Sequence, residues 1–261
     1  MKAVAITDHG NMFGVKEFIN AAEKKNAPVQ DEIKRIKCEL DAVNQSENPE
    51  KHAELSNQLQ AEKDKLFKPI IGCEAYIAKN SRFDRTEKDD RGGFHLILLA
   101  KNNEGYHNLV KLVSYSWTEG FYYKPRMDKE LLRKYSKGII ASSACLGGEI
   151  PQAIMAGDLA SAEKIIYEYK EIFGDDFYIE LMLHKSGDYR IDQDVYENQV
   201  KVNNALIELS KKTGVKCIAT NDTHFINASD AQAHDRLICL STGKDLDDPD
   251  RLRYTKQEYL K

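Results

Sequence analysis

The sequence predicts an α/β protein, and three observations support that prediction. Six short apolar segments rich in β-branched residues recur along the chain, at residues 2–7, 68–78, 94–100, 138–144, 176–183 and 215–222. Stretches with helical spacing of apolar residues separate them. The chain has 261 residues, of which 41% are hydrophobic and 31% charged. This length and composition are typical of a globular protein with a sizeable core.

The intervening helices follow from the apolar periodicity. After the first strand, apolar residues from Met12 to Ala22 recur at helical spacing. Further helices are expected at residues 103–117, 151–173 and 195–212. Gly174 and Gly214 follow the last two, where C-terminal caps belong. The expected order is therefore strand and helix in alternation along the whole chain.

The stretch at residues 28–67 breaks this rhythm. Ile33, Ile36 and Leu40 continue an apolar seam through a highly charged segment, and Leu55 and Leu59 form a second one. Residues 44–49 separate the seams as a polar turn, with Asn48 as N-cap and Pro49 at the first helical position. We expect an inserted helical hairpin within one domain of residues 1–261. A flexible charged loop is the alternative.

The overall charge and the cysteines exclude several protein classes. With 38 basic and 42 acidic residues, the net charge of −4 gives the molecule no overall attraction for nucleic acid. Local basic patches that bind nucleic acid are still possible. The five cysteines form no CxxC pair and no disulfide framework. No apolar run is long enough for a membrane span, and Met1 begins no signal peptide, so we expect a cytoplasmic protein without a membrane partner.

Metal-ligating residue types fall repeatedly beside the predicted strands. Six α/β units each contribute one or more, namely Asp8, His9, Glu74, His95, Cys145, His184, Asp222 and His224. The C-terminal ends of strands in barrel-like α/β folds converge on one face, so these side chains are candidates for one polynuclear metal centre. Imidazole and carboxylate suit zinc, manganese or iron, and a single thiolate favours zinc.

Each residue taken alone has a simpler interpretation. A histidine at a strand end is more often a surface or capping residue than a ligand, and a cysteine is commonly a small buried apolar residue. Repetition over six units favours the metal interpretation. His95 does not fit the pattern, because it begins its predicted strand whereas the others lie within or after theirs.

The ordered blocks of the sequence resemble the PHP (polymerase and histidinol phosphatase) domain found at the start of bacterial DNA polymerase III alpha subunits. The similar blocks include AITDHGNMFGVKEF, KPIIGCEAYIA, FHLILLAKNNEGYHNLVKLVS, GFYYKPRMDKELL, GIIASSACLGGEIP, FYIELMLH and IATNDTHF. The resemblance implies a distorted (β/α)7 barrel with up to three divalent metal ions, zinc or manganese, with magnesium or iron as alternatives. The metal ligands that the resemblance implies are His9, Glu74, His95, Cys145, Asp222 and His224.

Other residues are assigned supporting roles. Asp8 and His184 match family positions that we expect to orient the ligands. Lys124 and Arg126, in the segment FYYKPRMD, are candidates for gripping a phosphate, with Tyr122 or Tyr123 stacking on a base. A solvated basic turn beside packed aromatic residues is the alternative for this segment.

The family's first strand, which carries a His-x-His pair, has no counterpart before residues 2–7. We therefore expect a barrel lacking its first strand, with three ligands missing and a sheet edge exposed. Residues 245–261 resemble the connection into the next polymerase segment, and no nucleotide-adding palm is present. We expect a fragment truncated at both ends.

Three functions remain open at this point. The resemblance implies the N-terminal region of a replicative DNA-directed DNA polymerase, whose PHP site is a metal-dependent phosphoesterase or a 3′ to 5′ proofreading exonuclease. Its partners would be DNA, the remaining alpha-subunit domains and other replisome subunits. A free-standing phosphoesterase acting on a small monoester is the second hypothesis. The third is that this chain is inactive and serves as a packing module.

Overall fold

The computed structural model describes residues 1–43, 45–46, 48–86 and 91–261. The strands are β1 (Ala3–Ile6), β2 (Lys68–Ile77), β3 (Phe94–Ala100), β4 (Phe121–Tyr122), β5 (Lys124–Met127), β6 (Ile139–Ser142), β7 (Phe177–Leu181) and β8 (Cys217–Ala219). The α-helices are α1 (Val15–Ala42), α2 (Pro49–Lys63), α3 (Asn103–Thr118), α4 (Lys129–Tyr135), α5 (Glu149–Met155), α6 (Leu159–Phe173), α7 (Tyr189–Asp194), α8 (Tyr196–Thr213) and α9 (Ala231–Thr242).

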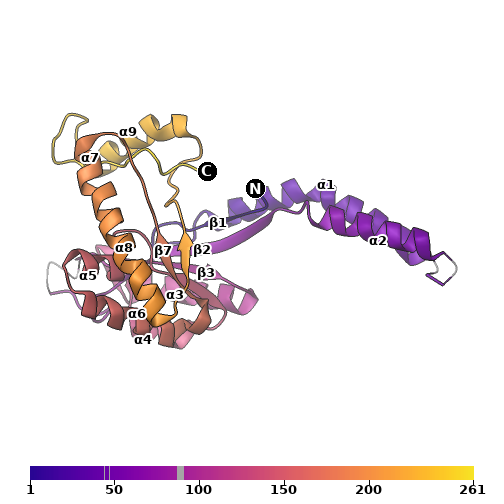
Figure 1. Ribbon diagram of the computed structural model, residues 1–261, viewed down its shortest axis with the longest axis horizontal. Helices are drawn as coiled ribbons and strands as arrows, with labels where there is room; N and C mark the ends of the chain where they lie inside the picture. Colours follow the sequence, from indigo (N-terminus) through magenta and orange to yellow (C-terminus); the bar gives the residue numbers. More distant parts are fainter. Residues whose placement is uncertain (44, 47, 87–90) are drawn as a thin grey trace.

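One curled sheet forms a half-barrel with helices packed around it (Figure 1). Its strand order is β4-β5-β2-β3-β6-β7-β8, and β1 pairs with the first half of β2. The pairs β1 with β2, β2 with β5, β6 with β7 and β7 with β8 are parallel. The predicted distorted α/β barrel is confirmed as a curled half-barrel, and β1 and β8 each pair with one strand among the described residues.

Strand β3 runs against its neighbours, because it pairs antiparallel with both β2 and β6. The beginning of β3 therefore lies at the same rim as the ends of the other strands. His95 stands opposite Tyr76, near the end of β2. This reversal removes the apparent misfit of His95 in the sequence pattern.

The main core fills the space between the inner helices and the sheet. It includes Leu98 of β3, Leu112 of α3 and Ile166 of α6, which are all fully buried. The predicted single helix at 151–173 is wrong, since the chain breaks into α5 and α6. Gly157 adopts a φ of +82°, and Asp158 caps α6 by accepting from the amide of Ser161.

The charged stretch forms two antiparallel helices that project from the body as an arm (Figure 1). The boundary expected at residue 28 is absent, because α1 runs without interruption through Pro28 to Ala42. Asn48 caps α2 as expected, with its side chain accepting from the amide of Lys51. Residues 44 and 47 of the expected turn lie outside the described residues. None of the described helices is both long enough and apolar enough to span a bilayer.

Candidate metal centre

A cavity of about 700 Å³ opens at the rim of the half-barrel. Its walls come from β1, from the ends of β2, β6, β7 and β8, and from the turns that follow them. Six of the predicted site residues line it, namely Asp8, His9, Glu74, Cys145, Asp222 and His224. Residues separated by more than 200 positions in the sequence therefore share one site.

Glu74 is the centre of a first cluster. His95 Nδ1 lies 2.7 Å and His9 Nδ1 lies 3.3 Å from the same carboxylate oxygen, Glu74 Oε1. Cys145 Sγ lies 3.5 Å from His95 Nδ1. Backbone pairing fixes this arrangement, since His9 bridges to Glu74 and the amide of His95 donates to Gly147. Four predicted ligands from four separate segments therefore meet at one place.

The charges of this cluster are strongly coupled. Burial acts to raise the pKa of Glu74, but the hydrogen bonds from His9 and His95 outweigh it and lower the pKa to about 2. The same contact with Glu74 raises the pKa of His9. Burial raises the pKa of the Cys145 thiol above its usual range. The cluster thus combines a stable carboxylate, imidazoles and a thiol, which is a donor set typical of zinc sites.

Asp222 and His224 form the neighbouring part of the site. The ring of His224 lies 5.6 Å from the ring of His9, measured between centroids. His224 Nδ1 lies 2.7 Å from the carbonyl oxygen of Asp222, and Asp222 adopts a φ of +45° in this tight turn. Burial raises the pKa of the Asp222 carboxyl, and the nearby Glu74 adds to that effect.

His184 is buried behind this pair. Its side chain is buried, and its backbone amide donates to Gln199 Oε1 at 2.7 Å. Its Nδ1 lies 3.3 Å from Gln199 Nε2 and 3.8 Å from Glu258 Oε1. Burial lowers the pKa of His184. His184 therefore contacts residues around Asp222, in keeping with a supporting position, while its expected role in orienting ligands remains a prediction.

Two buried side-chain atoms behind this cluster lack a hydrogen-bond partner in the described part of the chain. They are His184 Nε2 and Glu258 Oε2. A buried polar atom without a partner costs free energy, and an unfilled ion position is one explanation for it. The orphaned atoms mark the site as a place built for an additional polar or charged group.

The donor set fits a divalent metal ion in its chemistry. The separations of 2.7 to 3.5 Å among Glu74, His9, His95 and Cys145 are close to those between ligand atoms that share a zinc ion, roughly 3.3 to 3.7 Å for bonds of about 2.0 to 2.3 Å. The side chains turn toward one another, however. Over the described ranges, no three His, Cys, Asp or Glu side chains are already arranged to hold a cation.

Asp8 and Lys124 flank the first cluster. The Asp8 carboxylate accepts from the amide of Gly14 at 2.9 Å, so it fixes the turn that enters α1. The backbone carbonyl of Asp8 accepts from the amide of Glu74. The Lys124 ammonium lies 5.2 Å above the ring of Tyr76, whose hydroxyl lies 3.4 Å from His9 Nδ1. Lys124 is exposed beside the site, where a phosphate can reach it.

The expectation that Arg126 grips a phosphate is wrong for this structure. Arg126 is 1% exposed, and its guanidinium donates to the backbone carbonyls of Gly120, Arg82 and Asp84. Lys124 and Arg126 lie on the same face of β5, but the backbone of Arg82 and Asp84 contacts only the Arg126 guanidinium, which stabilises the loop before β3. Short strands β4 and β5 were not expected from the sequence, because two and four residues are too few for a recognisable pattern.

Several residues at the site were not predicted. Glu180 lines the cavity, and Glu258 and Tyr254 approach it from the last segment of the chain. The Tyr254 hydroxyl lies 3.3 Å from His224 Nε2, and the ring of His234 packs beside both rings. Glu180 could have been found from the sequence, since its carboxylate interrupts an otherwise apolar strand. No sequence pattern points to Glu258 or Tyr254.

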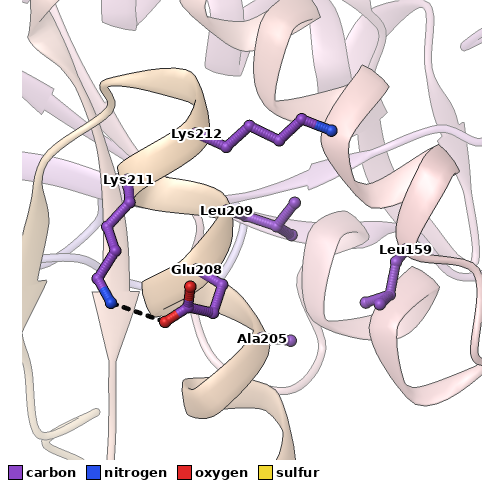
Figure 2. Close-up of a pocket in the computed structure, with 6 residues that line it drawn as sticks. All are labelled: Leu159, Ala205, Glu208, Leu209, Lys211 and Lys212. Atoms are coloured by element: carbon purple, nitrogen blue, oxygen red, sulfur yellow. Dashed lines mark hydrogen bonds and ion pairs between the residues drawn. The ribbon is translucent and has the colours of Figure 1, made fainter.

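A second hollow, of about 560 Å³, lies between α6 and α8 (Figure 2). It is lined by Leu159, Ala205, Leu209, Lys212 and the ion pair of Lys211 with Glu208. None of the predicted site residues faces it. The carboxylate among its described lining residues, that of Glu208, is paired with Lys211.

The PHP domain family model matches residues 1–184. The chain belongs to the PHP domain family. The matched region contains His9, Glu74, His95 and Cys145, and Asp222 and His224 follow it.

Curated relatives extend this similarity over nearly the whole chain. It is 40% identical over 261 residues to a DNA polymerase III subunit alpha of Borreliella burgdorferi, covering 99% of the chain and 18% of that protein. The corresponding protein of Thermus aquaticus is 39% identical, over 98% of the chain and 17% of its own length. That of Helicobacter pylori is 38% identical, over 99% and 18%. This PHP chain thus spans less than a fifth of these relatives.

Proposed function

We propose that the rim of this PHP barrel binds divalent metal ions and hydrolyses phosphodiester bonds. The observation that supports this most strongly is the convergence of Glu74, His9, His95 and Cys145, whose donor atoms lie 2.7 to 3.5 Å apart. Zinc or manganese suits these donors best.

Each residue has a role in this proposal. Glu74, His9, His95 and Cys145 hold one cation, and Asp222 with His224 holds part of a second. Bound divalent ions would supply a hydroxide near neutral pH and neutralise charge on the phosphoryl oxygens. Lys124 attracts the phosphate, and Asp8 fixes the backbone on which His9 lies. His184 and Glu258 support Asp222 from behind.

We place this chain in a DNA polymerase III alpha subunit, because relatives of that name match nearly all of it. In that setting DNA, the other alpha-subunit domains and further replisome subunits are its partners, in the cytoplasm. Nucleotide addition belongs to parts of those relatives that this chain does not match. A 3′ to 5′ exonuclease activity at the metal site is the finer form of the proposal.

An inactive packing module is the second candidate function. It is favoured by the absence, within the described residues, of three donors already arranged around a cation. In this alternative the barrel serves to hold other parts of the polymerase, and any hydrolysis is impaired. The two candidate functions predict different metal binding and different rates of hydrolysis. Both quantities can be measured on the same set of samples.

The test loads the purified chain with zinc or manganese, removes the excess and measures bound metal by elemental analysis. We expect at least one tightly held ion, which His95→Ala weakens by more than about 100-fold, since even residues behind the ligands contribute 10- to 100-fold. His107→Ala is the matched control, because His107 is an exposed histidine on α3.

The same samples are then offered single-stranded DNA and a phosphate monoester. Cleavage of DNA that His95→Ala abolishes supports the phosphodiesterase. Bound metal without any turnover supports the packing module, and hydrolysis of the monoester alone supports a free-standing monoesterase. No metal uptake at all would contradict the proposed centre.

A further inference from the structure

An exposed aromatic strip lies beside the candidate centre and takes no part in it. Its members are Phe13, Trp117 and Phe121, which are 81%, 42% and 46% exposed. Phe13 and Trp117 have ring centroids 6.4 Å apart, and Trp117 stacks on Phe121 at 5.4 Å. Three large rings left in solvent in one row are unusual for a surface with no function.

The strip is fixed rigidly to the candidate centre. Trp117 Nε1 donates to the carbonyl of Gly10 at 2.8 Å, and Gly10 directly follows His9. Gly10 has a φ of +66°, and a Cβ there would lie 2.7 Å from Pro125 and 2.9 Å from Tyr76. The turn therefore packs tightly against the strand ends, so the distance from the rings to His9 is set by the fold.

Phe13 is held by the same turn. The side chain of Asn11 accepts from the amide of Phe13 at 2.9 Å and donates to the carbonyl of His9 at 2.9 Å. Phe13 and Trp117 border a groove of about 430 Å³ between the start of α1 and α3, which Val110 and Val113 also line. The groove is apolar, and no acidic side chain lines it.

A basic region continues this groove. The adjoining cavity, of about 610 Å³, shares Met12, Val15 and Tyr106 with it and is also lined by Lys16, Lys68 and Lys101. None of the described residues that line this cavity is acidic. Lys101 is paired with Asp176, whereas Lys16 and Lys68 are exposed and have no carboxylate partner among the residues described.

We propose that this groove, the aromatic strip beside it and the basic cavity together form a binding track for single-stranded DNA, in which bases stack on Phe13, Trp117 and Phe121 while Lys16 and Lys68 contact the phosphates. Exposed aromatic rings combined with a positively charged groove are the features by which proteins bind single strands without sequence preference. The aromatic end of the track lies beside the centre, because Trp117 contacts Gly10 directly after His9, so the strand would be led toward it. This inference rests on the proposed function and names the substrate class of that site.

The test uses the single tryptophan of the chain, Trp117, as its probe. Metal-free protein in EDTA is titrated with a short oligothymidylate, and the tryptophan fluorescence is followed. We expect saturable quenching that weakens with salt, because base stacking reaches the indole directly. An abasic oligonucleotide of the same length should bind more weakly and quench little.

Variants at Phe13 separate stacking from folding, since this side chain is almost wholly in solvent. Phe13→Ala should raise the Kd for oligothymidylate at least about 5-fold, and Phe13→Tyr should restore it. Tyr189→Ala, which removes an exposed aromatic ring on α7, is the matched control and should leave the Kd unchanged.

Two results would overturn the inference. One is a Phe13→Ala protein that binds oligothymidylate as tightly as the original chain, and the other is equal quenching by the abasic strand. Binding of an apolar helical peptide in the groove, with no binding of DNA, would also overturn the inference. Hydrolysis of the base-free diester bis(p-nitrophenyl) phosphate by metal-loaded protein is measured separately. If the protein does not hydrolyse this diester but DNA still quenches its tryptophan fluorescence, the result counts against the proposed function and not against the binding track.

Discussion

Glu180 is the buried carboxylate that joins three strand ends below the candidate centre. It accepts from the hydroxyls of Ser142 and Thr220 at 2.5 and 2.6 Å and from the amide of Ala144 at 3.1 Å. These donors follow or end β6 and β8, while Glu180 lies on β7. Burial raises its pKa, and the hydrogen bonds act in the opposite direction. Glu180 thereby fixes the turn that carries Cys145.

Replacing Glu180 should therefore destabilise the fold as well as the site. We expect Glu180→Ala to lower the free energy of unfolding by about 2 to 4 kcal/mol, because buried donors lose their acceptor. Glu180→Gln keeps an acceptor oxygen and should lose less. Urea unfolding measures both. Glu208→Ala, at an exposed glutamate on α8, is the control and should change stability by less than about 0.5 kcal/mol.

A Glu180→Ala chain with unchanged stability would show that water replaces the carboxylate at no cost. The strand ends would then be held together by their backbone pairing alone.

At single residues, the sequence predicted which side chains the fold brings together at the rim but not their surroundings, and their role as metal ligands remains a prediction. The pattern of histidine and carboxylate beside strands was sufficient for Glu74 and Asp222, since strand ends converge in this fold class. Arg126 was misplaced because burial within a four-residue strand depends on the neighbouring loop. Glu258 was missed because the last segment folds back onto residues 224–226 through contacts distant in sequence.

At the scale of elements, the direction of β3 decides the composition of the centre. If β3 ran parallel to β2, His95 would lie at the opposite rim, far from Glu74. The antiparallel register places His95 opposite Tyr76 and two residues from the position facing Glu74. Local periodicity predicted that this strand exists, but strand direction depends on connections that periodicity does not contain.

The arm formed by α1 and α2 has a core of its own. Ile33, Ile36, Leu55 and Leu59 are buried between the two helices and form a cluster separate from the main core. At its base, the side chain of Asn26 exchanges two hydrogen bonds with the backbone of Phe67. The arm is therefore an independently packed element attached at one place.

This separation predicts local unfolding. Ile36→Ala should cost about 2 to 5 kcal/mol within the arm, which is more than so small a core can absorb. Hydrogen exchange of α2 and of the distal half of α1 should accelerate, while exchange in β2 and β3 stays slow. Lys37→Ala, at the neighbouring exposed position, should change neither. Equal acceleration in the arm and the sheet would show that the arm is part of the main cooperative unit.

For the whole molecule, the half-barrel has its open side next to its candidate centre. Along the described residues, β1 and β8 each pair with one strand only, and residues of both line the 700 Å³ cavity. The alternation of strands and helices predicted this architecture well, because long apolar segments determine it. The cavity's depth, its orphaned polar atoms and the aromatic strip depend on side-chain packing across the fold, which no local pattern reports.

The central claim is that donors from distant strands share cations at the barrel rim. Anomalous diffraction from crystals of this chain grown with zinc, and separately with manganese, tests it most directly. The account predicts a metal peak bonded to Glu74 and flanked by His9, His95 and Cys145, with further density near Asp222 and His224. Metal-saturated crystals with no peak at these side chains would contradict it.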